Sequence, residues 1–132
     1  MISQYNNTTN QRSWVVIANA AEIGFIYSTL GSNFFQITGT GSLLTAGVWQ
    51  HWCFERNDSG VFRTYVDGVM DGKDSSTAAA LHNSTTTVTI GNRDSGGYDL
   101  DGHIDNLRVT KGVARYNDDA GFTPPTITFP GL

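Results

Sequence analysis

The chain has 132 residues, a formal net charge of −4 from 12 acidic and 8 basic residues, and 15 glycines. This length supports one hydrophobic core, and we expect a single domain over residues 1–132. The basic residues are scattered, so nucleic acid is not an expected partner. No signal sequence opens the chain and no apolar run approaches the roughly 20 residues of a membrane-spanning helix, so we expect neither signal-directed export nor membrane insertion.

Short runs of β-branched and aromatic residues alternate with turn residues along the whole chain, and helical spacing is weak even at its best, over residues 76–81. This pattern predicts an all-β protein, an antiparallel β-sandwich with little helix. The candidate strands are residues 2–5, 13–18, 22–28, 33–38, 49–56, 61–67, 87–91 and 102–110.

Two features of the early and middle strands carry structural predictions. Phe34 and Phe35 are neighbours in a candidate strand, so one of them must point away from the core, where it is free to meet a partner chain. The Asn-Asp-Ser-Gly turn at residues 57–60 tolerates positive φ, so the strands on either side of it should form a hairpin. Within that hairpin, Trp52 and Phe54 should share one face.

The Asp67-Gly68 pair predicts a second tight turn, which leads into Val69 and Met70. Cys53 has no partner for an internal disulfide and lies between Trp52 and Phe54. We therefore expect a small buried side chain and not a reactive thiol.

The last candidate strand breaks its own alternation, because Ile104, Leu107 and Val109 cannot all point to one side of a regular strand. A β-bulge near residues 105–106 would restore the register. Asp105 and Arg108 flank this bulge, and we expect structural roles for both of them.

Beyond this strand, Pro124 and Pro125 cannot donate to a ladder and should hold an extended strap across the sandwich. Arg115 and Tyr116 are expected to stack on that strap.

Three segments in this order resemble the central part of laminin-G-like domains of the concanavalin A-like lectin and glucanase class. They are residues 49–56 (Trp-Gln-His-Trp-Cys-Phe-Glu-Arg), residues 62–69 (Phe-Arg-Thr-Tyr-Val-Asp-Gly-Val) and residues 87–92 (Thr-Val-Thr-Ile-Gly-Asn). Residues 102–116 and 122–126 are similar to the end of the version found in tailed-bacteriophage structural proteins. The resemblance implies a jelly roll of two curved sheets and, in many members, glycan or protein binding at loops, sometimes with calcium.

Compared with this family, the sequence looks shortened at its amino terminus, because residues 2–6 resemble an internal strand. The resemblance therefore implies a jelly roll that lacks some opening strands, with uncovered sheet edges. Self-association as a dimer or trimer, or pairing with another virion protein, would cover them.

Catalysis is not expected. Glucanases of this fold resemble one another in placing carboxylates at alternate positions of one strand, about 5 Å apart in retaining enzymes. Here Asp99 and Asp101 are two residues apart, but in a glycine-rich loop. The three histidines, His51, His82 and His103, lack the spacing of a zinc site.

The richest polar segment is the loop over residues 92–101, Asn-Arg-Asp-Ser-Gly-Gly-Tyr-Asp-Leu-Asp. An aromatic ring among amide and carboxylate groups suits a sugar, and oxygen donors suit calcium, the one candidate cofactor. A third interpretation stays open, in which the polar side chains only satisfy their own turn. The candidate glycan ligands are Asn92, Arg93, Asp94, Tyr98 and Asp99, and the candidate calcium ligands are Asp94, Asp99 and Asp101.

Two function hypotheses follow from the sequence. The first is a non-catalytic appendage or decoration module of a bacteriophage virion that binds a cell-surface glycan or host receptor. The second is a purely structural virion domain that completes another protein. Either would be made in the host cytoplasm and act on the virion or another extracellular surface.

Overall fold

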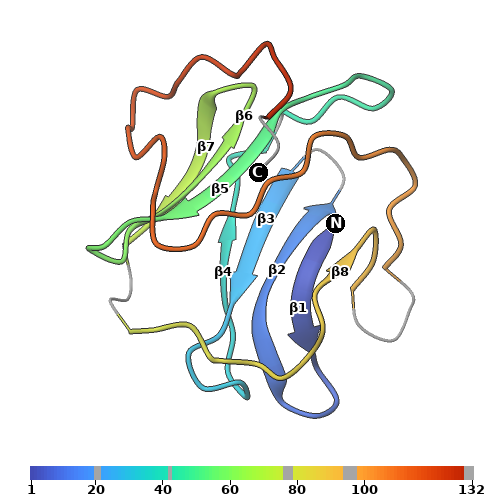
Figure 1. The fold of residues 1–132 in the computed structure, drawn as a ribbon, viewed down its shortest axis with the longest axis vertical. Coiled ribbons are helices and arrows are strands. Elements are labelled where there is room, and N and C mark those ends of the chain that lie inside the picture. Colours follow the sequence, from blue (N-terminus) through green and yellow to red (C-terminus); the bar gives the residue numbers. More distant parts are fainter. Residues whose placement is uncertain (20–21, 42, 76–78, 94–97, 130–132) are drawn as a thin grey trace.

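The computed structural model describes residues 1–19, 22–41, 43–75, 79–93 and 98–129. These residues form two antiparallel sheets, which confirms the predicted all-β sandwich (Figure 1). No helix in this part of the chain is long and apolar enough to cross a membrane.

The larger sheet has five strands in the order β4-β3-β2-β1-β8, and the smaller has three in the order β5-β6-β7. The larger sheet contains β1 (Ile2–Asn6), β2 (Gln11–Asn19), β3 (Glu22–Tyr27), β4 (Phe35–Thr38) and β8 (Thr89–Ile90). The smaller sheet contains β5 (Trp52–Arg56), β6 (Phe62–Val66) and β7 (Val69–Asp74). The first seven candidate strands each overlap an observed strand. No strand was predicted at β7, whose first two residues were expected only to follow the turn at residues 67–68.

The predicted hairpin is confirmed, since β5 and β6 pair with Trp52 opposite Val66 and Phe54 opposite Thr64. Its turn is held by the Asn57 side chain, whose Oδ1 accepts a hydrogen bond from the Val61 N–H at 2.9 Å. Gly60 has a φ of 81°, the left-handed conformation that such turns require. The sequence therefore fixes this pairing locally.

The second turn is also confirmed, with φ values of 50° at Asp67 and 81° at Gly68. Positive φ at both central residues is the signature of a two-residue type I′ hairpin, which connects β6 to β7. The C-terminal strap, by which we mean residues 117–125, crosses this turn, and the Phe122 N–H donates to the Gly68 carbonyl at 2.9 Å. A Cβ atom at position 68 would collide with the Phe122 carbonyl oxygen. Glycine is therefore required both by this close contact and by the positive φ.

Tyr116 stacks on the strap through the ring of Phe122, with centroids 3.5 Å apart and planes nearly parallel. Arg115 donates to the Thr110 hydroxyl at 3.2 Å.

The prediction of a strand over residues 102–110 is wrong, because this segment joins neither sheet among the described residues. The proposed bulge is wrong with it, since a bulge needs two paired strands. Asn106 nevertheless has a φ of 52° and donates its N–H to the Asp105 carboxylate at 2.8 Å, so the chain kinks where the bulge was expected. The Arg108 guanidinium lies 3.9 Å from the Phe129 ring centroid, a local structural contact like that of Asp105.

Aromatic rings hold the two sheets together. Tyr27 of β3 stacks on Phe62 of β6 with centroids 4.2 Å apart, and both side chains are buried. Phe25, two residues before Tyr27 on the same face of β3, reaches Phe54 of β5 at 6.0 Å. Phe35 adds a ring to Tyr27 at 5.2 Å but is itself 39% exposed, and its neighbour Phe34 is 60% exposed, so neither member of this pair is fully in the core.

The opposite face of the larger sheet has its own apolar cluster. Tyr5, Val15 and Ile26 are buried there, with Met1 and Ile17 packed against them. Val15 pairs with Ile26 in the register of β2 and β3. Ile26 lies between Phe25 and Tyr27 in β3, so its side chain points to the other face of the sheet from those two rings. Both faces of this sheet are therefore apolar.

Phe62→Ala should lower the free energy of unfolding by about 3–5 kcal/mol, because it removes a buried ring from the junction of the two sheets. Urea denaturation followed by tryptophan fluorescence measures this. Ile127→Ala, at an exposed position, should stay within about 0.5 kcal/mol of the parent. Equal effects of the two changes would contradict this account of the core.

Candidate functional site

The glycine-rich loop leaves the edge of the larger sheet, where β8 pairs with β1. Its base is closed twice: the Gly91 N–H donates to the Met1 carbonyl at 2.8 Å, and the Leu100 N–H donates to the Gly91 carbonyl at 2.7 Å. Gly91 has a φ of 87°, which turns the chain out of the strand. We call residues 91–101 the edge loop.

Arg93 connects the described part of the edge loop to the larger sheet through two aromatic rings. Its guanidinium carbon lies 3.8 Å from the centroid of the Tyr98 ring and 5.4 Å from that of Tyr5. Both distances are within the range of cation–π attraction. Tyr5 is buried in β1, so the sheet anchors Arg93, and Arg93 in turn supports one face of the exposed Tyr98.

Asn92 is tied to the sheet through its backbone. Its carbonyl accepts hydrogen bonds from the Thr89 hydroxyl at 3.1 Å and from the Ser3 hydroxyl at 3.4 Å. The two hydroxyl groups also lie 2.9 Å from each other. In the described part of the chain, Asn92 Oδ1 and Arg93 Nε are buried and have no hydrogen-bond partner. Asn92 and Arg93 thus each bury one polar atom without a hydrogen bond, and such a buried atom lowers the stability of the folded state unless a partner pairs with it.

The structure therefore brings two of the predicted glycan ligands, Arg93 and Tyr98, into contact. It ties Asn92 to the sheet through its backbone and leaves Asp99 exposed. Asp94 lies outside the described residues. Sequence analysis missed Tyr5 and Ser3, which support the edge loop from a strand more than eighty residues away. A strand residue gives no local signal that it contacts a distant loop.

Asp99 and Asp101, two of the three predicted calcium ligands, are exposed. Among the described residues, no group of three or more acidic, histidine or cysteine side chains is placed to hold a metal ion. The calcium prediction needs Asp94 as a third ligand, so it stays a prediction.

Millimolar calcium should raise the melting temperature if the edge loop binds it, because a ligand bound only by the folded state stabilises that state. Differential scanning calorimetry with calcium and with a chelator measures the shift, and the Asp99→Asn, Asp101→Asn double variant should abolish it. Identical melting curves in calcium and in chelator would remove calcium from the account of this loop.

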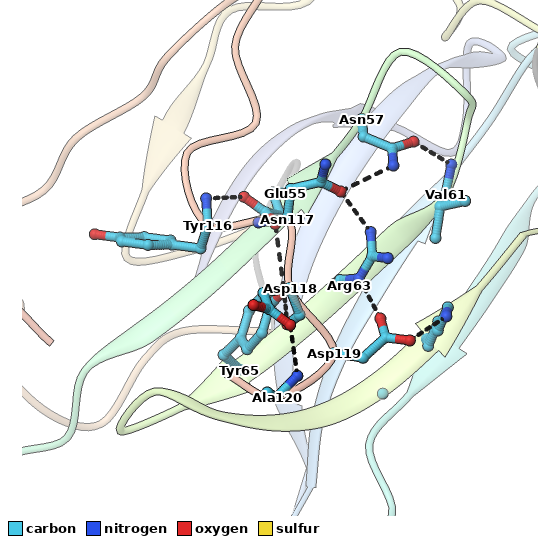
Figure 2. A network of polar contacts seen from close by, with 12 residues as sticks. Glu55, Asn57, Val61, Arg63, Tyr65, Tyr116, Asn117, Asp118, Asp119 and Ala120 are labelled. Atoms are coloured by element: carbon cyan, nitrogen blue, oxygen red, sulfur yellow. Dashed lines mark hydrogen bonds and ion pairs between the residues drawn. The ribbon is translucent and has the colours of Figure 1, made fainter. Parts of the chain in front are cut away.

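A polar network fixes the C-terminal strap on the outer face of the smaller sheet (Figure 2). Arg63 of β6 is buried and donates through Nε to Asp119 at 2.7 Å and through Nη1 to Asn117 at 2.8 Å. Lys73 of β7 adds an ion pair to Asp119 at 2.5 Å. A buried guanidinium needs such partners, because leaving it unpaired would be costly.

Glu55 of β5 completes this network. Its carboxylate accepts hydrogen bonds from the N–H groups of Tyr116, at 3.0 Å, and Asn117. The Tyr65 hydroxyl lies 3.0 Å from the Asp118 carbonyl and 3.3 Å from Glu55 Oε1. Burial, and then the negative charge of Glu55, raise the pKa of Tyr65, so this hydroxyl stays protonated.

A shallow polar hollow of about 370 Å³ lies between the β5–β6 turn and the segment that this network holds. Its volume is at the small end of ligand pockets. Asn57 also bonds to Asn117 at 2.9 Å across its floor. Sequence analysis did not predict this hollow, because its two walls are about fifty residues apart. Its lining residues are Asn57, Asp58, Ser59, Gly112, Val113, Ala114 and Asn117.

Cys53 is half-buried, and the pKa of its thiol is raised to about 12 by burial and by the Glu55 charge. A thiol with so high a pKa is a poor nucleophile at neutral pH. Burial also lowers the pKa of His51, which favours its neutral form. Neither group has the setting of a catalytic residue.

Asp119→Asn should lower the melting temperature at neutral pH, because it removes the charge that pairs with Lys73 and Arg63. These partners hold the pKa of Asp119 below its ordinary value of 3.8. The stabilisation is therefore present above that value and is lost as pH falls through the lower pKa of the folded state. Melting curves from pH 7 to pH 2 should show the parent and variant converging below about pH 4. Asp58→Asn, in an exposed turn, serves as the control, and a gap between parent and Asp119→Asn that stayed constant down to pH 2 would contradict this role.

Comparison with known proteins places these features in context. A family model described as the concanavalin A-like lectin/glucanases superfamily matches residues 1–115, which include both sheets and the edge loop. No curated protein and no solved structure matches the chain.

Proposed function

The chain belongs to the concanavalin A-like lectin/glucanases superfamily, and from that premise we propose that it is a non-catalytic carbohydrate-binding module. We place the sugar on the edge loop, against Tyr98. Superfamily membership supports the class of function, and the geometry of the loop supports the position.

The observation that carries this proposal is the supported tyrosine. Tyr98 is 51% exposed, while Arg93 and the buried ring of Tyr5 hold it from behind. A flat ring held in this way can stack on the CH face of a sugar with little loss of side-chain entropy.

Polar groups beside the ring suit the hydroxyl groups of a sugar. The exposed carboxylate of Asp99 is an acceptor that is open to a ligand. Asn92 Oδ1 and Arg93 Nε also lack a partner in the described part of the chain, but both atoms are buried, so a sugar reaches them only if these side chains move. An aromatic ring with adjacent donors and acceptors is the chemistry that a glycan requires.

The assignment as non-catalytic rests on what the carboxylates do. Glu55 binds the strap backbone, Asp119 pairs with two cations, and Asp71 accepts from the Thr40 N–H at 3.2 Å. A glycosidase needs two carboxylates facing one bond. Glu55, Asp119 and Asp71 instead hold the fold.

The biological setting that we propose is a bacteriophage virion, where the module would recognise a cell-surface glycan or host receptor. The support is the resemblance of residues 102–116 and 122–126 to the end of domains in tailed-phage structural proteins. The alternative is a purely structural domain that assembles with another virion protein. The exposed apolar side chains of Leu30, Phe34 and Trp49 favour this alternative, because such residues often mark protein contacts.

Tyr98→Ala should reduce glycan binding at least tenfold and leave the melting temperature unchanged, because an exposed ring contributes contact area to a ligand and little to the core. A glycan array identifies the ligand, and titration calorimetry with that ligand compares the variants. Phe34→Ala is the matched control and should bind like the parent, since Phe34 is an exposed aromatic residue next to β4, at the opposite edge of the larger sheet from β8.

Two results would redirect the proposal. No binding to any glycan on the array would favour the structural alternative. Binding that resists Tyr98→Ala but is lost in the Asp58→Ala, Ser59→Ala double variant would move the sugar to the polar hollow.

A further inference from the structure

Trp49 is a second exposed aromatic side chain that lies beside another ring. It is 70% exposed, at the end of the loop that leads into β5. The ring of His103, which is also exposed, lies 6.3 Å from the Trp49 ring, with the two planes 48° apart. An indole presents a broad flat face and carries an N–H donor for a hydroxyl group. The Trp49–His103 pair therefore offers the same kind of contact as Tyr98 in the edge loop.

The backbone next to Trp49 is held in place by side chains. Gln50 Oε1 accepts a hydrogen bond from the Thr45 N–H at 2.8 Å, which closes the loop behind Trp49. Asp67, in the β6–β7 turn, accepts from the Gln50 side chain at 3.2 Å and from the His51 N–H at 2.8 Å. A loop fixed in this way loses little conformational entropy when its aromatic side chain meets a ligand.

A short piece of chain joins this pair to the edge loop. His103 follows Tyr98 by five positions, and an extended chain of that length spans at most about 18 Å between Cα atoms. Leu100 lies between them, and its N–H donates to the Gly91 carbonyl at 2.7 Å, which fixes the piece to the larger sheet. Figure 1 shows the orange trace continuing from the edge loop towards the start of β5. The two aromatic sites are therefore close neighbours on the surface.

The chain between the two sites is polar. Asp99 and Asp101 are exposed, and Gly102, also exposed, has no side chain that could stand between the rings. Carboxylates accept hydrogen bonds from sugar hydroxyl groups, whereas charged residues are depleted from the centre of protein–protein interfaces. Separate rings with acceptors between them match the CH faces and hydroxyl groups of successive sugars better than they match the apolar surface of a protein.

We propose that the Trp49–His103 pair is a second sugar-binding platform, and that the ligand is a glycan chain that reaches from Tyr98 to Trp49. This inference rests on the proposed function, because it takes the edge loop as the first of two subsites. Binding at the first ring raises the effective concentration of the chain at the second, so two weak contacts act together. The protein therefore selects oligosaccharides and polysaccharides over single sugars.

The length of the glycan is the variable that tests this proposal. The probes are oligosaccharides from starch, cellulose and chitin, together with the best-binding glycan of the array cut to the same lengths. Titration calorimetry with the full protein chain measures the Kd of each. Affinity should rise about tenfold or more between the shortest fragment that binds and a chain that reaches both rings, and then stay level.

Trp49→Ala should weaken binding of the long oligosaccharide by about tenfold or more and leave the shortest binding fragment unaffected, because only the long chain reaches the second platform. Trp49→Phe keeps a flat ring and should retain most of the affinity. Val48→Ala is the matched control, since Val48 is an exposed neighbour on the same loop without a ring and should bind like the parent. The melting temperatures of all three variants should equal that of the parent, because both side chains are exposed.

The opposite outcomes are distinct. Equal affinity of the parent and Trp49→Ala at every glycan length would overturn the second platform and leave the proposed function intact. Loss of binding in Trp49→Ala at every length, with Tyr98→Ala unaffected, would overturn the placement of the sugar on the edge loop and with it the pair of subsites. A lower mass of Trp49→Ala than of the parent by light scattering, without a change in glycan affinity, would make Trp49 a contact between copies of the chain. A protein that binds no glycan would remove both proposals.

Discussion

Stacking of Tyr27 on Phe62 is the interaction on which the rest of the molecule depends. It joins β3 in the middle of the larger sheet to β6 in the middle of the smaller one, and Phe25 extends the contact to Phe54 in β5. Each sheet alone would expose a row of aromatic side chains, and the smaller sheet has only three strands. Burying these rings against each other supplies the large apolar area that a domain of this size needs.

The outer face of the smaller sheet is stabilised differently. Among the described residues, Phe122 of the strap packs there against Tyr65 and Tyr116, and polar contacts from Arg63 and Glu55 hold the strap beside it. Arg63 is buried under the strap and would be an uncompensated charge without Asp119. The strap is thus a structural part of the domain, and it also forms one wall of the polar hollow.

The edge loop is anchored through the larger sheet. It follows β8, which pairs with β1, and Arg93 connects it to a buried tyrosine of that strand. The described part of the loop is therefore positioned by strand pairing and by a cation–π contact with a residue far away in the sequence.

The sequence by itself determined the all-β class, most strands, both tight turns and the edge loop, because period-two alternation and turn chemistry are local properties. It could not determine the conformation of residues 102–110, whose apolar and β-branched residues predict a strand with a bulge, because a strand also requires a neighbour to pair with. It also could not show that the Tyr5 ring packs against Arg93, which in turn supports Tyr98, or that Arg63 forms an ion pair with Asp119. Those contacts join residues far apart in the chain, so only the tertiary structure decides them.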